Sequence, residues 1–88
     1  MQFLKEHLSP GNYEWNNDLI YNGDPSRRRY NRNNGNQLLF VINLYGALQT
    51  SFDINKGLMI QDLLKNKLPV DAKSEISVLH WLKEKIVA

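Results

Sequence analysis

Apolar residues recur at helical spacing in the C-terminal half of the chain. They return every three or four positions within residues 54–68 and again within residues 72–87, which predicts a helix in each range. Pro69 ends the first of these helices because the residue before a proline avoids helical backbone. We expect the first helix to bury Met59, Ile60, Leu63 and Leu64, and the second to carry an apolar stripe of Val78, Leu79, Leu82 and Ile86. The candidate N-caps are Asp53 or Asn55, then Asp71 or Ser74.

Residues 37–50 form the most apolar stretch, and their pattern fits two structures. The long apolar run favours a helix capped by Asn36, whereas the β-branched and aromatic residues of 40–42 suit a strand over 37–45. A membrane span needs about 20 apolar residues, and Asn43 interrupts this shorter run, so we expect a buried helix and no membrane contact. The helix would place Leu38, Val41, Ile42, Tyr45 and Leu48 on one side.

The N-terminal half has no sustained pattern. Residues 1–8 predict a short helix, and residues 22–25 (Asn-Gly-Asp-Pro) predict a turn that closes a short β-hairpin onto residues 27–32. Of the eleven asparagines, eight lie between Asn12 and Asn36, and asparagine favours turns and irregular backbone. We therefore expect a loop-rich segment here.

These patterns predict a mainly α fold, in which a loop-rich or short β-hairpin N-terminal segment packs on about three helices near 37–50, 54–68 and 72–87. The alternative is an α+β fold, with a small antiparallel sheet that includes 37–45 and is covered by two C-terminal helices. A chain of 88 residues has room for a single domain, residues 1–88. The predicted core comprises Leu38, Val41, Ile42, Tyr45, Leu48, Ile60, Leu63, Leu64, Leu79, Leu82 and Ile86.

The composition excludes several kinds of chemistry. The chain has no cysteine, so disulfides, thiolate nucleophiles and cysteine-based zinc sites are ruled out. A secreted domain of this size usually needs such cross-links, and Lys5 and Glu6 stand where a signal peptide would be apolar. We therefore expect a cytoplasmic protein.

No motif predicts catalysis, and we expect a non-catalytic protein without a cofactor. The five glycines are not clustered as in a phosphate-binding loop, and no serine occupies a nucleophile elbow. His80 and Glu84 lie four residues apart on a predicted helix, but a metal site needs at least three protein ligands. We expect no metal site.

Charge is distributed unevenly along the chain, although the net charge is only +2. Residues 1–25 contain four acidic residues and one lysine, whereas residues 26–36 contain four arginines and no acidic residue. All arginines of the protein lie in residues 27–32, which we call the basic segment. Because predicted turns flank this segment, we expect it to protrude.

The candidate binding residues are Arg27, Arg28, Arg29, Tyr30 and Arg32. Arginine pairs with phosphate through a planar fork, and a tyrosine can stack on an exposed base. The first hypothesis is therefore a small regulatory protein that contacts nucleic acid through this basic loop. If four phosphates were neutralised on a duplex, log K would fall with log salt at a slope near about −3.6.

Two other interpretations of the basic segment stay open. An acidic protein surface would recognise the same residues, which would make the chain a protein–protein adaptor or inhibitor. The arginines would alternatively be structural if they paired with Glu14, Asp18 or Asp24. Self-association through an apolar patch at Phe40 and Leu44 also stays open.

Overall fold

The computed structural model describes residues 2–16, 21, 23–49 and 51–86. Within them the chain forms three α-helices, and a single 3-10 turn (Lys5–His7) precedes these. The mainly α prediction is confirmed, with each helix slightly shorter than expected. The helices are α1 (Gly35–Ala47), α2 (Ile54–Asn66) and α3 (Glu75–Lys85).

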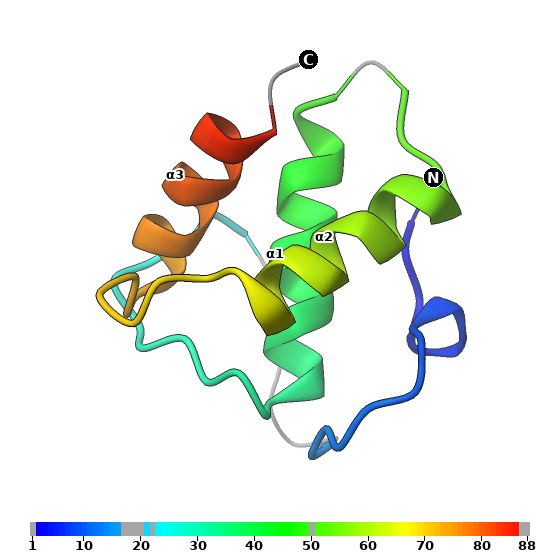
Figure 1. Ribbon diagram of the computed structural model, residues 1–88, viewed down its shortest axis with the longest axis horizontal. Coiled ribbons are helices and arrows are strands. Elements are labelled where there is room, and N and C mark those ends of the chain that lie inside the picture. Colours follow the sequence, from blue (N-terminus) through cyan, green and yellow to red (C-terminus); the bar gives the residue numbers. More distant parts are fainter. Residues whose placement is uncertain (1, 17–20, 22, 50, 87–88) are drawn as a thin grey trace.

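Helix α1 is central and packs against both α2 and α3. In Figure 1, α2 crosses in front of α1, and α3 stands to the left of both. Residues 2–13, which we call the N-terminal arm, run along the opposite side of the molecule from α3 (Figure 1). Because 37–45 is helical, the α+β alternative is wrong.

Each helix begins at a polar residue whose side chain accepts a backbone hydrogen bond. Asn34 rather than Asn36 caps α1, since the Asn34 Oδ1 atom accepts from the Gln37 nitrogen at 3.1 Å and the helix starts earlier than predicted. For α2 and α3, one of the two candidates is the cap in each case. These caps are Asp53 and Ser74.

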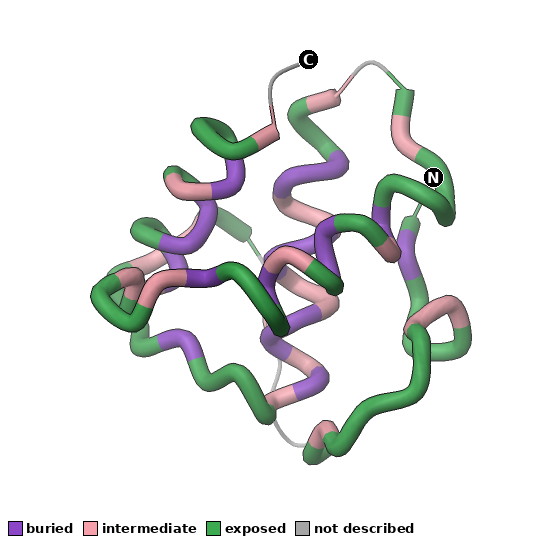
Figure 2. Tube along the Cα trace, in the orientation of Figure 1, coloured by how far each residue is buried: buried purple, intermediate pink, exposed green. Residues whose placement is uncertain are grey.

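The apolar core lies between the three helices, as the buried stretches in Figure 2 show. Two expectations are wrong: Leu48, which lies beyond the end of α1, is 55 % exposed, and Met59 is 42 % exposed. Leu63 and Ile86 are only partly buried at the edge of the core. The remaining predicted positions are buried: Leu38, Val41, Ile42, Tyr45, Ile60, Leu64, Leu79 and Leu82.

The N-terminal arm is irregular apart from its 3-10 turn, so within the described part of residues 1–8 the predicted short helix is reduced to the single turn Lys5–His7. Its main anchor is Phe3, which is only 1 % exposed and was not predicted to be in the core. Asn43 of α1 holds the backbone of Phe3 from both sides. The Phe3 nitrogen donates to Asn43 Oδ1 at 2.7 Å, and Asn43 Nδ2 donates to the Phe3 carbonyl at 2.9 Å.

No β-strand occurs in the described residues, and the predicted hairpin is not seen among them; residues 17–20 and 22 lie outside that part. Two isolated bridges form instead. Glu14 pairs with Asn34 in parallel, and Arg29 pairs with Ser74 in antiparallel orientation. The basic segment therefore lies against the start of α3 rather than against residues 12–16.

Candidate functional site

A buried carboxylate lies where the basic segment meets the helices. Glu75 is the first residue of α3, and its side chain is fully buried. It accepts hydrogen bonds from Arg28 Nε at 2.8 Å, from Gln37 Nε2 at 2.7 Å and from both the nitrogen and Oγ of Ser26 at 3.2 Å. We call these four residues the polar clamp.

Gln37 of α1 extends the polar clamp to the backbone of the basic segment. Its Nε2 also donates to the Arg29 carbonyl at 3.0 Å, and its Oε1 accepts from the Asn31 nitrogen at 2.8 Å. The side chain is 1 % exposed, so these bonds replace its contacts with water. On the other side of the segment, the Tyr30 nitrogen donates to the Lys73 carbonyl at 2.8 Å. The basic segment is thus fixed from two directions.

The polar clamp keeps Glu75 ionised despite its burial. Burial by itself raises the pKa of a carboxyl group, but hydrogen bonds from Arg28, Gln37 and Ser26 outweigh this and lower the pKa of Glu75 below its usual value. The hydrogen bond to Glu75 raises the pKa of Arg28 in turn. One of the four arginine charges is therefore balanced internally, as the structural interpretation expected, but by an acid 47 residues away.

The other predicted site residues have different surroundings. Arg27 and Arg29 are exposed, and within the described residues their guanidinium groups make no hydrogen bond or ion pair. Arg32 donates from Nη2 to the carbonyls of Leu68 at 2.7 Å and Pro69 at 3.2 Å. This contact ties the basic segment to the loop between α2 and α3 and orients the Arg32 side chain.

Tyr30 differs most from the expectation of a protruding loop. Its side chain is buried, 7 % exposed, and belongs to the apolar core. Burial is the main reason that the pKa of its phenol lies above the ordinary value, with Tyr13 as a lesser cause. Tyr30 cannot stack on an exposed base in this conformation. Its role is to anchor the basic segment, which lies along the protein surface rather than away from it.

An open groove of ≈ 760 Å³, which we call the large groove, lies along the outer side of the basic segment. Three of the predicted arginines and one lysine line it, with Tyr30 and Gln37, while Arg27 does not. Among the described residues no acidic side chain lines it. The four cations are Arg28, Arg29, Arg32 and Lys73.

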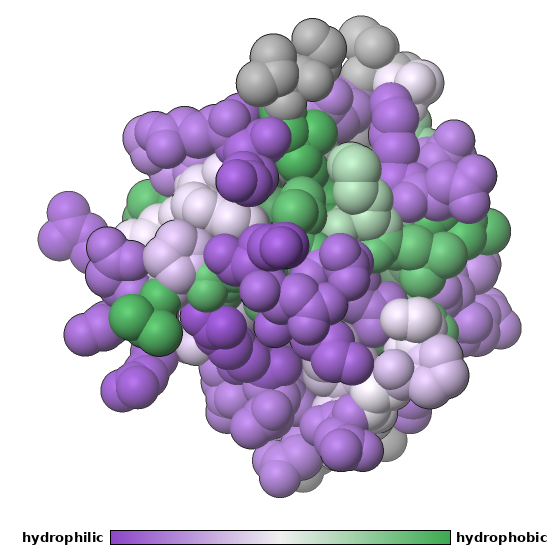
Figure 3. Space-filling model, viewed as in Figure 1, coloured by the Kyte–Doolittle hydropathy of each residue, from purple (hydrophilic) through white to green (hydrophobic). Residues whose placement is uncertain are grey.

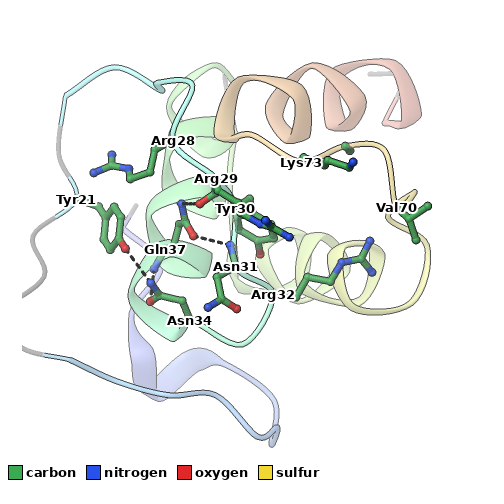
Figure 4. A pocket seen from close by; sticks show the side chains of 11 residues that line it. Tyr21, Arg28, Arg29, Tyr30, Asn31, Arg32, Asn34, Gln37, Val70 and Lys73 are labelled. Carbon is green, nitrogen blue, oxygen red and sulfur yellow. Dashed lines mark hydrogen bonds between the residues drawn. The ribbon is translucent and has the colours of Figure 1, made fainter.

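Figure 4 shows how these side chains divide along the large groove. Arg28 lies over the ring of Tyr21, with its Cζ atom 4.5 Å from the ring centroid, while Arg29, Arg32 and Lys73 lie on the other side of Gln37. Because Arg28 is paired with Glu75, the uncompensated positive charge is concentrated at the second group. This end of the large groove is suited to hold an anion.

Sequence reasoning missed Lys73 as a site residue. It stands next to the N-cap of α3, 41 positions after Arg32, and looks like an ordinary surface lysine in the sequence. Only the pairing of Arg29 with Ser74 brings it to the basic segment. No local pattern signals such a contact, because it depends on how the basic segment crosses the start of the helix.

His80 Nδ1 lies 3.8 Å from Glu84 Oε1, and both side chains are exposed. No cluster of three or more potential metal ligands occurs in the part of the chain that the structure describes. None of the helices described there is long and apolar enough to cross a bilayer.

Comparisons with known proteins found no match for this chain among family models, curated proteins or solved structures.

Proposed function

We propose that this protein is a small, non-catalytic regulatory protein of the cytoplasm that binds nucleic acid at the large groove. The observation that supports this most is the set of three cations without an internal counter-charge, Arg29, Arg32 and Lys73, along a groove without acidic lining among the described residues. Phosphate groups match such a surface in charge and in hydrogen-bonding geometry.

The arginines then have different roles in binding. Arg28 contributes indirectly, because Glu75 balances its charge and its side chain helps to fix the basic segment. Arg29 and Lys73 are free to contact phosphates, and Arg32 is held in a defined direction by its bonds to backbone carbonyls. With three phosphate contacts, the slope of log K against log salt would be about −2.1 for a single strand or −2.7 for a duplex.

A second candidate is the adaptor or inhibitor that binds an acidic protein surface. Val70 favours it, because this apolar residue lines the large groove and is 87 % exposed. Apolar contacts beside charged pairs are typical of protein interfaces, whereas phosphate recognition has no use for an exposed valine. A partner of this kind would present acidic side chains around an apolar one.

Fluorescence anisotropy with labelled single- and double-stranded oligonucleotides tests the proposal. The informative variant is Arg29→Ala with Lys73→Ala, which removes two lining cations outside the polar clamp. Its matched control is Lys83→Ala with Lys85→Ala, which removes the same charge from exposed positions on α3 outside the large groove. Both variants should unfold as the wild type does, because neither removes a buried contact.

Each function predicts a distinct pattern of binding. Nucleic-acid binding predicts that the groove variant loses about tenfold or more in affinity at ~50 mM salt, while the control variant loses much less. Absence of wild-type binding at low salt would overturn the proposal. Nuclease-resistant capture of one stoichiometric protein, lost in Val70→Asn, would then support the second candidate.

A further inference from the structure

A second hollow of ≈ 370 Å³, the small groove, shares two lining residues with the large groove. These are Tyr30, which is buried, and Arg32, which is exposed. The small groove adds Lys65 from the last turn of α2, and no acidic residue lines it within the described part of the chain. Positive charge therefore continues past Arg32 onto the side of the molecule that carries the N-terminal arm.

Arg32 is well placed to serve both grooves. Its Nη2 donates to the carbonyls of Leu68 and Pro69, which fixes the direction of the guanidinium group. The Nε and Nη1 atoms keep their donors, since no hydrogen bond from them to a described residue occurs. A ligand backbone that passes from one groove to the other would meet the oriented guanidinium group of Arg32.

Each groove also contains one half-buried tyrosine and exposed amide groups. Tyr13 lines the small groove, and Tyr21 lines the large one, where Arg28 already lies over its ring. Asn31 lines the large groove and Asn12 and Asn33 the small one, all three exposed. Aromatic rings beside a basic track serve as stacking platforms for unpaired bases, and amides hydrogen-bond to base edges.

The helices themselves are poorly suited to duplex recognition. Proteins that read duplex DNA usually place a helix or a pair of strands in the major groove. Here Glu84 lies between Lys83 and Lys85 on the exposed face of α3, and Asp62 accompanies Lys65 on α2. The cations without an acidic partner among the described residues lie mainly in the irregular segments that line the large and small grooves. A flexible strand fits that arrangement better than a rigid duplex.

We infer that the ligand is a single-stranded nucleic acid that lies across Arg32 and occupies both grooves. Arg29 and Lys73 hold its backbone in the large groove, Lys65 holds it in the small groove, and a base rests on Tyr13. This inference rests on the proposed function and extends it, because it names the ligand and gives Lys65 a role.

The test uses a fluorescein-labelled thymidine strand of about 12 nucleotides, the same strand annealed to its complement, and the full-length protein. Lys65→Ala is compared with Lys67→Ala, which removes an exposed lysine two residues away that lines neither groove. We expect the single strand to bind more tightly than the duplex. Lys65→Ala should weaken it about threefold to tenfold and reduce the salt slope by about 0.7, with Lys67→Ala close to wild type.

The outcomes separate this inference from the proposed function. If the groove variant Arg29→Ala with Lys73→Ala loses affinity while Lys65→Ala binds like Lys67→Ala, the continuous path is wrong and the large groove remains the site. A preference for the duplex would also overturn the single-strand assignment. If the wild type binds neither probe at low salt, both proposals fail together.

Discussion

The N-terminal arm and the basic segment are both irregular, yet they are fastened to the helices by different chemistry. Neutral groups hold the arm: Phe3 fills the core, and the amide of Asn43 holds its backbone. Near the end of the arm, Gln61 of α2 accepts from the Ser9 nitrogen at 2.9 Å. A buried carboxylate, Glu75, holds the basic segment.

The difference shows how an irregular segment can be both fixed and charged. The arm carries one lysine, Lys5, whose Nζ lies 4.4 Å from the centroid of the Trp15 ring, and apolar burial and amide hydrogen bonds hold Phe3. The basic segment carries four arginines, and the polar clamp neutralises one of them while it fixes the backbone that carries the others. Because a carboxylate holds it, the basic segment should be sensitive to acid.

Truncation of Phe3 should give the largest change in stability. Phe3→Ala removes a side chain that is 1 % exposed, and we expect the free energy of unfolding to fall by about 4 kcal/mol. Urea denaturation monitored by circular dichroism measures this. Because a domain of this size has about 5 kcal/mol to lose, Phe3→Leu serves as a milder variant. A loss below about 1 kcal/mol for Phe3→Ala would mean that the arm is not docked.

Removal of the carboxylate in the polar clamp should rank next. Glu75→Ala leaves Gln37 and Ser26 without their buried acceptor, and we expect a loss of about 3 kcal/mol. The matched control is Glu84→Ala, which removes an exposed carboxylate from the same helix and should change the free energy of unfolding by less than about 0.5 kcal/mol. Equal effects from the two substitutions would contradict the polar clamp.

Acid should weaken the basic segment through the same carboxylate. The pKa of Glu75 in the folded protein lies below its unfolded value of ~4.3. Its contribution is therefore complete above the unfolded pKa and is lost as the pH falls through the folded pKa. The difference in free energy of unfolding between wild type and Glu75→Gln should shrink below about pH 4. A difference that stays constant down to the acid transition would refute this linkage.

The substitution Gly57→Ala tests how closely the arm packs on α2, and we expect a small change in the free energy of unfolding, opposite in sign to the usual one. Alanine usually stabilises a helix interior by ~1 kcal/mol over glycine, but a Cβ at Gly57 would overlap the ring of Phe3. We expect Gly57→Ala to lower the free energy of unfolding by about 1 kcal/mol. In a Phe3→Ala background the same substitution should become stabilising, and a double-mutant cycle by urea denaturation measures this coupling. Stabilisation in both backgrounds would exclude the contact.

Much of the helical part could be predicted from the sequence. Apolar spacing located α2 and α3, the long apolar run favoured a helix over a strand for α1, and Asp53 and Ser74 were among the candidate caps. These features depend on residues that are close in sequence, so a local pattern records them. Asn34 was missed as the N-cap of α1 because neighbouring asparagines look equally good as caps.

The candidate site was harder to predict, because its contacts join residues far apart in sequence. The arginines were found by composition, but nothing local distinguished Arg28, which pairs with Glu75, from Arg29, which does not. Tyr30 was expected at the surface, yet it is 7 % exposed because the basic segment lies against the core. Lys73 belongs to the candidate site only because the fold brings it to the large groove.

The surface of the molecule bears on the hypothesis of self-association through an apolar patch. On the face shown in Figure 3, hydrophilic side chains cover most of the area and separate smaller hydrophobic patches. Phe40 and Leu44, the candidates for self-association, are half-buried in the structure, and Phe40 lies 5.8 Å from Tyr21 between ring centroids. Part of the apolar surface expected for self-association is therefore used within the chain.

The central claim is that Arg28 fixes the basic segment through Glu75, whereas Arg29 contacts the ligand. The most direct test measures unfolding and oligonucleotide binding for the alanine variant of each arginine. Arg28→Ala should lower the free energy of unfolding by about 1–2 kcal/mol, since it removes the partner of a buried carboxylate, and its folded form should keep most of the affinity. Arg29→Ala should leave stability unchanged and lose about threefold to tenfold in affinity. Equal losses of affinity without loss of stability, or the reverse assignment, would contradict the account.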